Sequence, residues 1–325
     1  MTSAAPDNAV LMRIRTRQLL LVAQIAQVHN LGRAAAALGI SQPAATKLLQ
    51  QLESSLGASL FEREPRGMSP TPLGEAVVRF AQQVQTDFGA VREEMAALRA
   101  GLQGRLRLGS VPGALPGLVA PVLGDYKRAH PRVAVTLLVE TSDVMLAQLD
   151  RGEVDLVLGR VTEGHHDEAF DSRPLLGEAQ VVVVRSGHPL LRVRRALDWA
   201  ELARWPWILQ PPGSPQRARF EAAAREAGVQ GRLDITETAS TVATTTLLEH
   251  SDMAAVMPAS LAGHYARLGV LRVLPAAPPF AVPPIHLITR RQRVLSPAAL
   301  AFMQQVSAFA VQPVDPGGML TPLKT

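Results

Sequence analysis

The side chains best suited to chemistry in this sequence lie in one short stretch, residues 41–47. Gln42 can form paired hydrogen bonds with the edge of an adenine, and Thr46 can exchange a hydrogen bond with a base or contact a thymine methyl group. Lys47 can reach a guanine or a phosphate. The two alanines between Gln42 and Thr46 are small enough to let a helix approach a groove closely. This combination predicts a helix that recognises the edges of DNA base pairs.

Two helices joined by a tight turn are expected to position these side chains. Apolar residues recur at helical spacing over residues 16–29, which predicts a first helix. Asn30 is the predicted N-cap of a short second helix over 33–38, and Ser41 is the predicted N-cap of a third helix that ends near Leu56. Pro43 fits the first turn of that helix. The arrangement is that of a helix-turn-helix.

Residues 60–71 are predicted to form two short strands around a turn, a wing whose Arg63 and Arg66 would lie along DNA phosphates. Residues 8–71 carry seven basic side chains against three acidic ones, whereas the rest of the chain is close to neutral within a net charge of +5. A small basic module favours binding to a polyanion. Each signal has a structural alternative, because Ser-Gln-Pro is also a good helix start and arginines in turns are often only solvated.

The combined pattern closely resembles the winged helix-turn-helix of LysR-type transcriptional regulators. The matching stretches are RAAAALGISQPAATKLLQQLE (33–53), LG (56–57), LFER (60–63) and SPTPLG (69–74). The resemblance implies that the major groove is contacted by Ser41, Gln42, Pro43, Thr46 and Lys47, with Arg33, Arg63 and Arg66 nearer the DNA backbone. The family commonly has Ser-Arg where this chain has Thr46-Lys47, and lysine lacks the planar guanidinium for a bidentate guanine contact.

A long amphipathic helix is predicted over residues 72–101. Its apolar positions recur about every 3.6 residues, as a straight helix requires, at Leu73, Val77, Phe80, Val84, Phe88, Val91, Met95, Leu98 and Leu102. Such a stripe needs a covering surface, so we interpret this segment as a dimerisation helix. The alternative is that the stripe packs on the chain's own C-terminal domain. In family terms the segment resembles the linker helix that pairs subunits.

Beyond residue 104, strand-like and helix-like segments alternate, which predicts mostly parallel sheets covered by helices. Strands are expected at 106–108, 133–140, 155–159, 179–185, 207–210, 233–238, 253–257 and 284–289. Helices are expected at 116–129, 142–151, 214–228, 240–249 and 296–310. Because the last strand and helix are expected to return to the first of two lobes, the chain would cross twice between lobes and leave a hinged cleft.

Ligands of open α/β sheets bind beyond the carboxyl ends of the strands. The candidate effector residues at those positions are Ser110, Thr141, Ser142, Arg160, Gly213, Ser214, Thr238, Ser240 and Thr241. Converging hydroxyls and amides suit a small polar or carboxylate-bearing molecule, and Arg160 could bind a carboxylate in bidentate fashion. Each residue also has an ordinary role, since Ser and Thr cap helices and Arg160 could pair with an acidic neighbour.

The C-terminal body resembles the two-lobed, type 2 periplasmic-binding-protein-like effector domain of LysR-type regulators. The resemblance rests on Pro131-Arg-Val, Gly152-Glu-Val-Asp-Leu156 and Gly187-His-Pro-Leu190. Against the common pattern, Ser251-Asp252 stands where many members have a Gly-x-Gly turn. Family precedent implies a homodimer that assembles into a homotetramer.

The predicted fold class is multidomain, and every part of the chain has an expected role. The parts are a winged helix-turn-helix domain (12–71), a dimerisation helix (72–101), a two-lobed α/β effector domain (104–310), with lobe one at about 104–177 and 280–310 and lobe two at about 178–279, and disordered ends (1–11 and 311–325).

The sequence excludes several classes of protein. With no cysteine, disulfide frameworks, thiolate metal sites and thiol nucleophiles are excluded. No catalytic signature occurs, and the adjacent His165-His166 lack the spacing of a metal site. No apolar stretch is long enough to span a membrane, and no secretory leader is evident. We therefore expect a cytoplasmic protein that is not an enzyme and has no cofactor.

The predicted function is sequence-specific transcriptional regulation, modulated by a small-molecule effector. The expected partners are double-stranded promoter DNA, an effector of carboxylate, aromatic or sugar type, and further copies of the chain, with RNA polymerase as an additional candidate. A ligand-independent architectural DNA-binding protein is the alternative. A solute-binding transport component would leave residues 12–71 without a role.

Overall fold

The computed structural model describes residues 14–64, 67–99, 103–161, 169–193, 195, 197–229, 233–275, 280–291, 293–311 and 320–322. The chain divides into two compact units, Met1–Glu93 and Glu94–Thr325, whose boundary falls within the long helix α5 (Pro72–Arg99). Each unit has its own buried apolar core.

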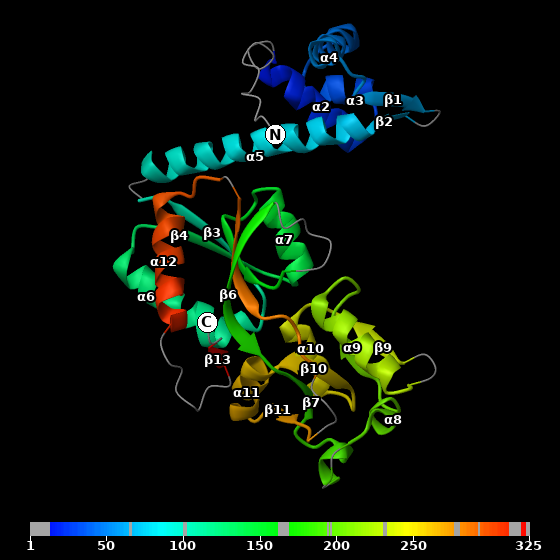
Figure 1. Ribbon diagram of the computed structural model, residues 1–325, viewed down its shortest axis with the longest axis vertical. Helices are drawn as coiled ribbons and strands as arrows, with labels where there is room; N and C mark the ends of the chain where they lie inside the picture. The colour runs from blue at the N-terminus through cyan, green and yellow to red at the C-terminus, as the bar shows by residue number, and fades with distance from the viewer. Residues whose placement is uncertain are drawn as a thin grey trace, which may run out of the picture. The chain divides into compact units, whose positions relative to one another are not determined.

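The N-terminal unit is a helix-turn-helix followed by a two-stranded wing (Figure 1). Its elements are α2 (Thr16–Val28), α3 (Leu31–Ala37), α4 (Gln42–Leu56), β1 (Phe61–Glu64) and β2 (Gly67–Pro70). The predicted caps are confirmed, because the Asn30 side chain accepts a hydrogen bond from the Arg33 amide at 2.9 Å and Ser41 accepts one from the Ala44 amide at 3.4 Å. Such bonds satisfy amides that the first helical turn leaves free.

The wing is fixed to the first helix through backbone contacts. β1 and β2 pair antiparallel with Phe61 opposite Pro70, and the Met68 amide donates to the His29 carbonyl at 2.9 Å. Gly67 has a φ of +146°, and a Cβ atom there would lie 2.3 Å from the His29 carbonyl oxygen. Only glycine therefore fits this position without displacing backbone. Beneath the wing, the core of the unit contains Leu21, Val22, Ile25, Ala45, Leu52 and Leu60.

Lobe one of the C-terminal unit is a six-stranded sheet of order β13-β6-β12-β5-β3-β4. Its strands are β3 (Arg105–Ser110), β4 (Ala134–Val139), β5 (Leu156–Gly159), β6 (Phe170–Glu178), β12 (Ile285–Arg290) and β13 (Leu320–Pro322). Its helices are η1 (Leu115–Val119), α6 (Ala120–Ala129), α7 (Ser142–Asp150) and α12 (Pro297–Val311).

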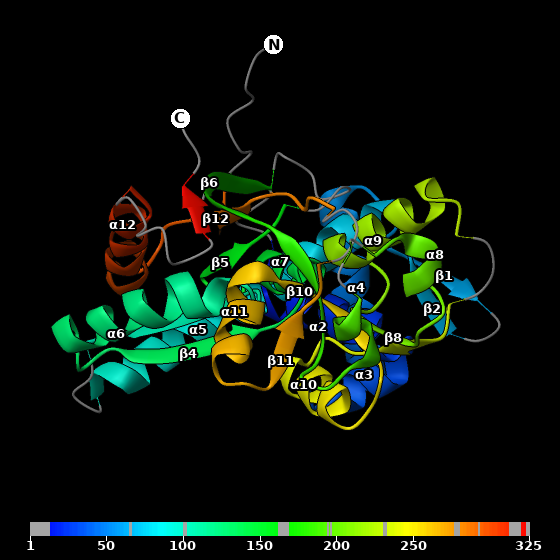
Figure 2. The same cartoon turned by 90° about the horizontal axis from the view of Figure 1, so that it is seen from below.

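Side chains of this sheet alternate between two buried layers. Leu156 and Leu158 of β5 belong to the core that Tyr126 of α6 and Phe302 of α12 complete. Val157, between the two leucines, packs instead with Met145 and other residues of α7. Because both faces are buried, the strand sequence is continuously apolar. Figures 1 and 2 show α6 and α12 side by side.

Lobe two is a five-stranded sheet of order β11-β7-β10-β8-β9. Its strands are β7 (Gln180–Arg185), β8 (Trp207–Leu209), β9 (Ile235–Glu237), β10 (Ala254–Pro258) and β11 (Leu271–Val273). Its helices are η2 (Pro189–Arg192), α8 (Trp199–Leu202), α9 (Pro215–Glu226), α10 (Thr241–Glu249) and α11 (Ala259–Arg267). Ile208 packs on one side of the sheet, and the flanking Trp207 and Leu209 pack on the other.

Two expectations about these lobes were wrong. Both sheets are mixed rather than mostly parallel, because β12 and β6 run antiparallel to their neighbours in lobe one, and β7 and β11 do so in lobe two. The segment 311–325 is not wholly disordered, since Leu320–Pro322 form β13 and pair with β6. The connections bring β12 and α12 back to the first sheet, as the sequence predicted.

Burial of His188 makes the stability of lobe two sensitive to acid. The side chain accepts a hydrogen bond from the Leu190 amide at 3.1 Å, its Nε2 atom lies 3.1 Å from the Asp252 carbonyl oxygen, and its ring packs on Trp205. Desolvation by burial lowers the pKa of His188 below its ordinary value of 6.5. The unfolded chain therefore binds more protons than the folded chain as pH falls, so the free energy of unfolding decreases from about pH 6.5 downward through the lower folded pKa.

Thermal unfolding at pH 7.5, 6.5 and 5.5 tests this prediction. The melting temperature of the wild-type chain should fall toward pH 5.5. His188→Asn keeps a side-chain acceptor for the Leu190 amide but cannot gain a proton, so it should melt at a lower temperature throughout and show a shallower pH dependence. Equal slopes for the two chains would contradict the assignment to His188.

Candidate nucleic-acid interface and effector cleft

Helix α4 separates a buried face from an exposed face that could contact DNA. Ala45, Leu49 and Leu52 are buried in the core of the N-terminal unit. Gln42 and Lys47 are exposed, together with Ser41, Pro43 and Ala44. Thr46 is half-buried, and its hydroxyl donates to the Gln42 carbonyl at 3.0 Å. The amphipathic pattern therefore leaves the groove-contacting candidates at the accessible N-terminal end of α4.

Two further arginines share a groove with this helix. Arg15 and Arg17, at the start of α2, line it with Lys47 and Gln51 of α4. Both arginines are exposed. Sequence reasoning counted them in the basic charge of residues 8–71 but did not include them among the DNA-binding candidates. That charge was the available signal, and only the packing of α2 on α4 places it beside Lys47.

The remaining DNA-contact candidates are described to different extents. Arg33 is exposed on the first turn of α3. Arg63 lies in β1, but its side chain is outside the described part of the structure, and Arg66 lies outside the described residues altogether.

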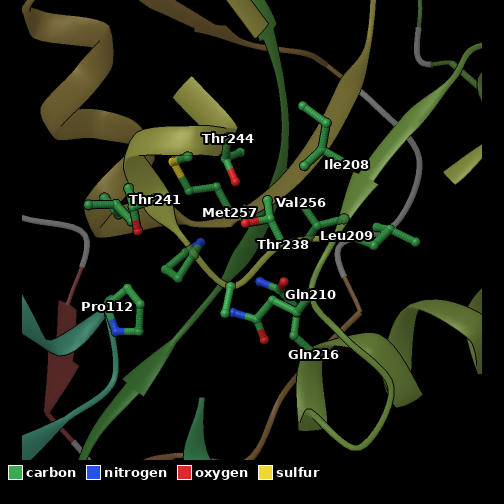
Figure 3. Close-up of a pocket in the computed structure, with 13 residues that line it drawn as sticks. Pro112, Ile208, Leu209, Gln210, Gln216, Thr238, Thr241, Thr244, Val256 and Met257 are labelled. Carbon is green, nitrogen blue, oxygen red and sulfur yellow. The ribbon is translucent and has the colours of Figure 1, made fainter. Parts of the chain in front are cut away.

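Two adjoining cavities of about 30 and 20 Å3 lie between the lobes of the C-terminal unit. Both are lined by Pro112 of lobe one and by Gln210, Gln216 and Pro258 of lobe two. In Figure 3, Thr238, Thr241 and Thr244 surround the larger cavity with Gln210 and Gln216. A cavity of this size holds about one water molecule, whereas a metabolite site occupies several hundred Å3. A metabolite would therefore need the lobes to separate or the side chains to rearrange.

Arg160 connects the two segments that cross between the lobes. Its Nη2 atom donates to the Glu178 carboxylate at 2.5 Å, at the end of β6. Its Nε atom donates to the Pro283 carbonyl at 2.9 Å, in the segment that leads into β12. The predicted alternative, an ion pair with an acidic neighbour, is confirmed for Arg160.

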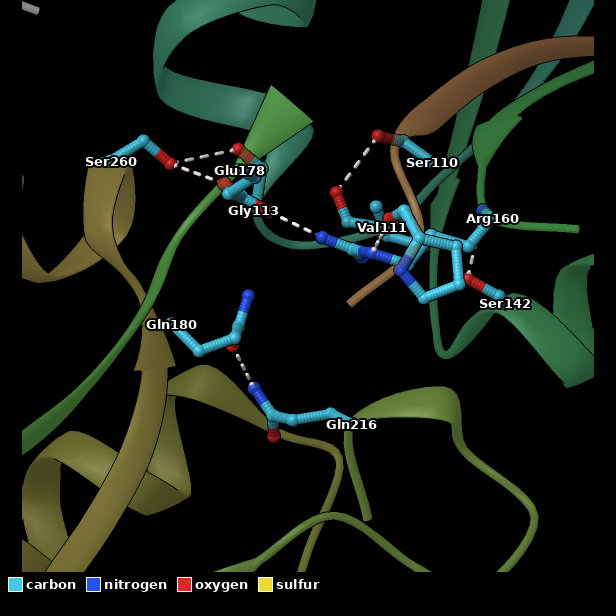
Figure 4. A network of polar contacts seen from close by, with 10 residues as sticks. Ser110, Val111, Gly113, Ser142, Arg160, Glu178, Gln180, Gln216 and Ser260 are labelled. Carbon is cyan, nitrogen blue, oxygen red and sulfur yellow. Dashed lines mark hydrogen bonds and ion pairs between the residues drawn. The ribbon is translucent and has the colours of Figure 1, made fainter. Parts of the chain in front are cut away.

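The other carboxylate oxygen of Glu178 is occupied from lobe two. Ser260 of α11 donates to it at 2.7 Å and lies 3.1 Å from the Gly113 carbonyl oxygen of lobe one (Figure 4). The Glu178 side chain has 0% exposure and that of Arg160 has 9%. Burial of a charge requires such compensation, so this network fixes the contact between the lobes.

The other predicted effector residues divide into two groups. Thr141 lines the smaller cavity with Ser142, whose hydroxyl accepts a hydrogen bond from the Arg160 amide at 3.0 Å, and Thr238 and Thr241 line the larger one. The second group does not line either cavity and has backbone roles. Ser110 donates to the Val111 carbonyl, Ser214 and Ser240 cap α9 and α10, and Gly213 has a φ of +96°.

Sequence reasoning missed the glutamines and the acidic partner of this cleft. Gln216 donates to Gln180 at 2.6 Å, and both side chains are buried (Figure 4). Gln180 begins β7 directly after the interlobe crossing, and Gln216 lies in the first turn of α9. A polar residue at a buried strand start was the available signal for Gln180, whereas β6, which ends at Glu178, was not predicted.

The departure from the family pattern at Ser251-Asp252 has a structural role. The Asp252 carboxylate pairs with Arg185 at 2.7 Å, and its carbonyl oxygen faces His188. The pair connects the end of β7 to the turn before β10. A glycine at this position would lack the carboxylate.

Within the described ranges, no group of three or more His, Asp or Glu side chains could hold a metal ion. His165 and His166 lie outside those ranges. None of the described helices is long and apolar enough to cross a membrane.

Together, a winged helix-turn-helix and a two-lobed α/β unit with a polar cleft define a DNA-binding regulator with its own effector domain. Residues 16–75 match the model of the bacterial regulatory helix-turn-helix protein, lysR family, and residues 99–310 match that of the LysR substrate binding domain. The chain therefore belongs to the LysR family of transcriptional regulators. It is a DNA-binding transcriptional regulator modulated by a small-molecule effector.

Curated relatives agree with this assignment, and a solved structure agrees with the fold. The chain is 37% identical over 287 residues to the HTH-type transcriptional regulator GbpR of Azospirillum brasilense, covering 88% of this chain and 84% of the relative. It is 30% identical over 291 residues to the HTH-type transcriptional regulator GalR of Pseudomonas putida, covering 89% and 72%. Among solved structures, CbnR, a LysR family transcriptional regulator, has a TM-score of 0.60 at 22% identity, covering 92% of this chain and 100% of that chain.

Proposed function

We propose that α4 enters the major groove and that its exposed N-terminal residues recognise bases. The observation that supports this most directly is the Ser41-capped helix, which presents Gln42 and Lys47 on its exposed face while Leu49 and Leu52 hold the opposite face in the core. Ser41, Pro43 and Thr46 would contact the groove beside them. Arg33, Arg63 and Arg66, joined by Arg15 and Arg17, would contact phosphates.

Substitution of Gln42 tests this assignment. Gln42→Ala should reduce affinity for the cognate operator by about 1–3 kcal/mol and relax the preference at one base position. The measurement is fluorescence anisotropy on the operator and on its single-base variants. Arg17→Ala is the matched control, because a lost phosphate contact should weaken binding to all sequences alike and reduce the salt slope by about 1. An equal loss on every sequence for Gln42→Ala would contradict base recognition.

Dimerisation through α5 would supply a second winged helix-turn-helix domain, and each such domain is a DNA-binding head of the dimer. The apolar stripe of this helix is exposed, with Phe80 at 50%, Phe88 at 67% and Leu98 at 59%. A single recognition helix contacts only a few bases, so useful specificity needs two heads on two half-sites. We further propose that dimers pair into a tetramer, as family precedent implies.

The cleft between the lobes is the proposed effector site. Because its cavities are small in this conformation, binding would change how the lobes sit across the Arg160–Glu178 contact. An effector with different affinities for the two arrangements would shift their populations and so alter the spacing of the heads on DNA. RNA polymerase is a candidate partner at the promoter, and the site of action would be the cytoplasm.

Footprinting on DNA upstream of the chain's own gene tests the regulator function directly. Protection of two half-sites, changed in length or position by an added metabolite, is the expected result. Protection that no metabolite alters, with unchanged promoter output, would instead favour an architectural DNA-binding protein.

A further inference from the structure

We propose that the interlobe cleft selects an uncharged, hydroxyl-rich ligand, such as a sugar or sugar alcohol, and discriminates against carboxylates. This inference rests on the proposed function, because it assumes that the effector occupies the cleft.

The only charged side chain that lines the described parts of the two cavities is already neutralised. Arg160 would be the natural partner of a ligand carboxylate, but its guanidinium pairs with the fully buried Glu178. A carboxylate ligand would have to displace Glu178 and leave that anion buried without its partner, which is a large penalty. Arg160 and Glu178 together therefore disfavour anionic ligands.

A second arginine near the cleft is compensated in the same way. Arg217 donates to the carbonyl of the cavity residue Gln210 at 3.1 Å, and its guanidinium also pairs with Glu221 at 2.6 Å and Glu237 at 3.0 Å. Its charge is thus balanced by two carboxylates, and it offers no net attraction to an anion.

An acidic group of lobe one also lies beside the cleft. Asp143 follows the cavity residue Ser142 on α7, and its Oδ2 atom lies 3.3 Å from the place of a Cβ atom on Gly213 of lobe two. Its Oδ1 atom is buried with no hydrogen-bond partner within the described chain. A buried acceptor of this kind needs a donor. A ligand hydroxyl can donate to it, whereas an ionised carboxylate cannot.

The cavity lining supplies neutral donors and acceptors. Gln180, Gln210 and Gln216 carry amides, and Thr238, Thr241 and Thr244 carry hydroxyls, so each of these side chains can both donate and accept. A polyol presents the same alternation of donors and acceptors along its carbon chain. Apolar surface from Ile208, Val256 and Met257 can pack against its C–H groups.

Matched pairs of ligands provide the test. The full-length chain is titrated with the aldopentoses, the aldohexoses and their alditols, and separately with the aldonate of each sugar. Binding is measured by thermal shift and by the change in affinity for operator DNA. At least one neutral compound should bind, and it should bind at least about tenfold more tightly than its aldonate, which corresponds to about 1.4 kcal/mol.

Two variants test the role of the internal carboxylate. Glu178→Gln leaves Arg160 without its counter-ion, so aldonates should gain at least about tenfold in affinity. The double variant Arg160→Gln with Glu178→Gln removes both charges. It should again discriminate against aldonates as the wild-type chain does. This comparison shows whether the gain in affinity for aldonates requires Arg160. If the melting temperature of the Glu178→Gln chain is too low for a titration, its increase on addition of acetate is measured instead.

Tighter binding of aldonates than of sugars by the wild-type chain would overturn the proposal. The proposal would also be overturned if the chain binds its operator but none of the neutral compounds. A chain that binds a neutral compound but no operator would instead refute the proposed DNA-binding role, so the two failures are distinguishable.

Discussion

Phe88→Glu is expected to prevent the pairing of two copies through α5 and to lower the affinity of the full-length chain for operator DNA by at least about 100-fold. Phe88 lies in the exposed apolar stripe of α5, which is the proposed contact between two copies. A carboxylate in that contact would be buried without compensation in both copies. Loss of the second head removes the gain of about 10²–10⁴ in affinity that linked binding provides.

Analytical ultracentrifugation and anisotropy with operator DNA measure the two effects. Gln82→Glu is the matched control, because Gln82 is an exposed residue on the polar side of the same helix. The substitution introduces the same charge as Phe88→Glu. The Gln82→Glu chain should keep the oligomeric state of the wild-type chain and bind DNA normally. A Phe88→Glu chain that also keeps the oligomeric state of the wild-type chain would show that the stripe packs elsewhere, for which the chain's own effector domain is the alternative.

Gly74→Ala is expected to destabilise the N-terminal unit and to weaken DNA binding. Gly74 lies in the first turn of α5, and a Cβ atom there would be 1.8 Å from the Leu60 carbonyl oxygen. The Leu60 backbone is held on both sides, because its amide donates a hydrogen bond to the Glu53 carboxylate at 2.8 Å and its carbonyl oxygen accepts one from the Thr71 amide at 3.0 Å. Overpacking against fixed backbone costs about 1–3 kcal/mol or more.

Gly89→Ala in the same helix should have the opposite effect. A Cβ atom at Gly89 meets nothing within 4 Å, and alanine stabilises a helix interior by about 0.5–1 kcal/mol relative to glycine. Calorimetry of both variants should show a lowered melting temperature of the N-terminal unit only in Gly74→Ala. Unchanged melting of that chain would contradict the close packing at Leu60.

The sequence was most informative where local chemistry determines structure. Asn30 and Ser41 cap helices because their short side chains can reach free amides of the first turn, and this depends on few neighbours. The long helix followed from a regular apolar period, and its residues Pro72–Arg99 form α5. Buried strands of the parallel core, such as Leu156–Gly159, are apolar throughout and were also predicted.

The elements that escaped prediction lack such local signals. β6 is exposed along much of its first half and contains Pro174, so it shows neither alternation nor a continuous apolar run. Leu271–Val273 and Leu320–Pro322 are three-residue strands that depend on pairing with β7 and β6. Without β6, the ion pair of Glu178 with Arg160 could not be foreseen, since 18 residues separate the partners. The cleft could be predicted as a position in the fold, but its charge balance depends on these long-range contacts.

Selection of genomic fragments by the purified full-length chain tests the central claim most directly. We propose that paired copies place two α4 helices in successive major grooves. Enriched fragments should therefore share two half-sites at a fixed spacing near a multiple of about 10 bp. An insertion of about 5 bp between the half-sites should weaken binding strongly. A monomeric chain with no preference among fragments at low salt would contradict the account.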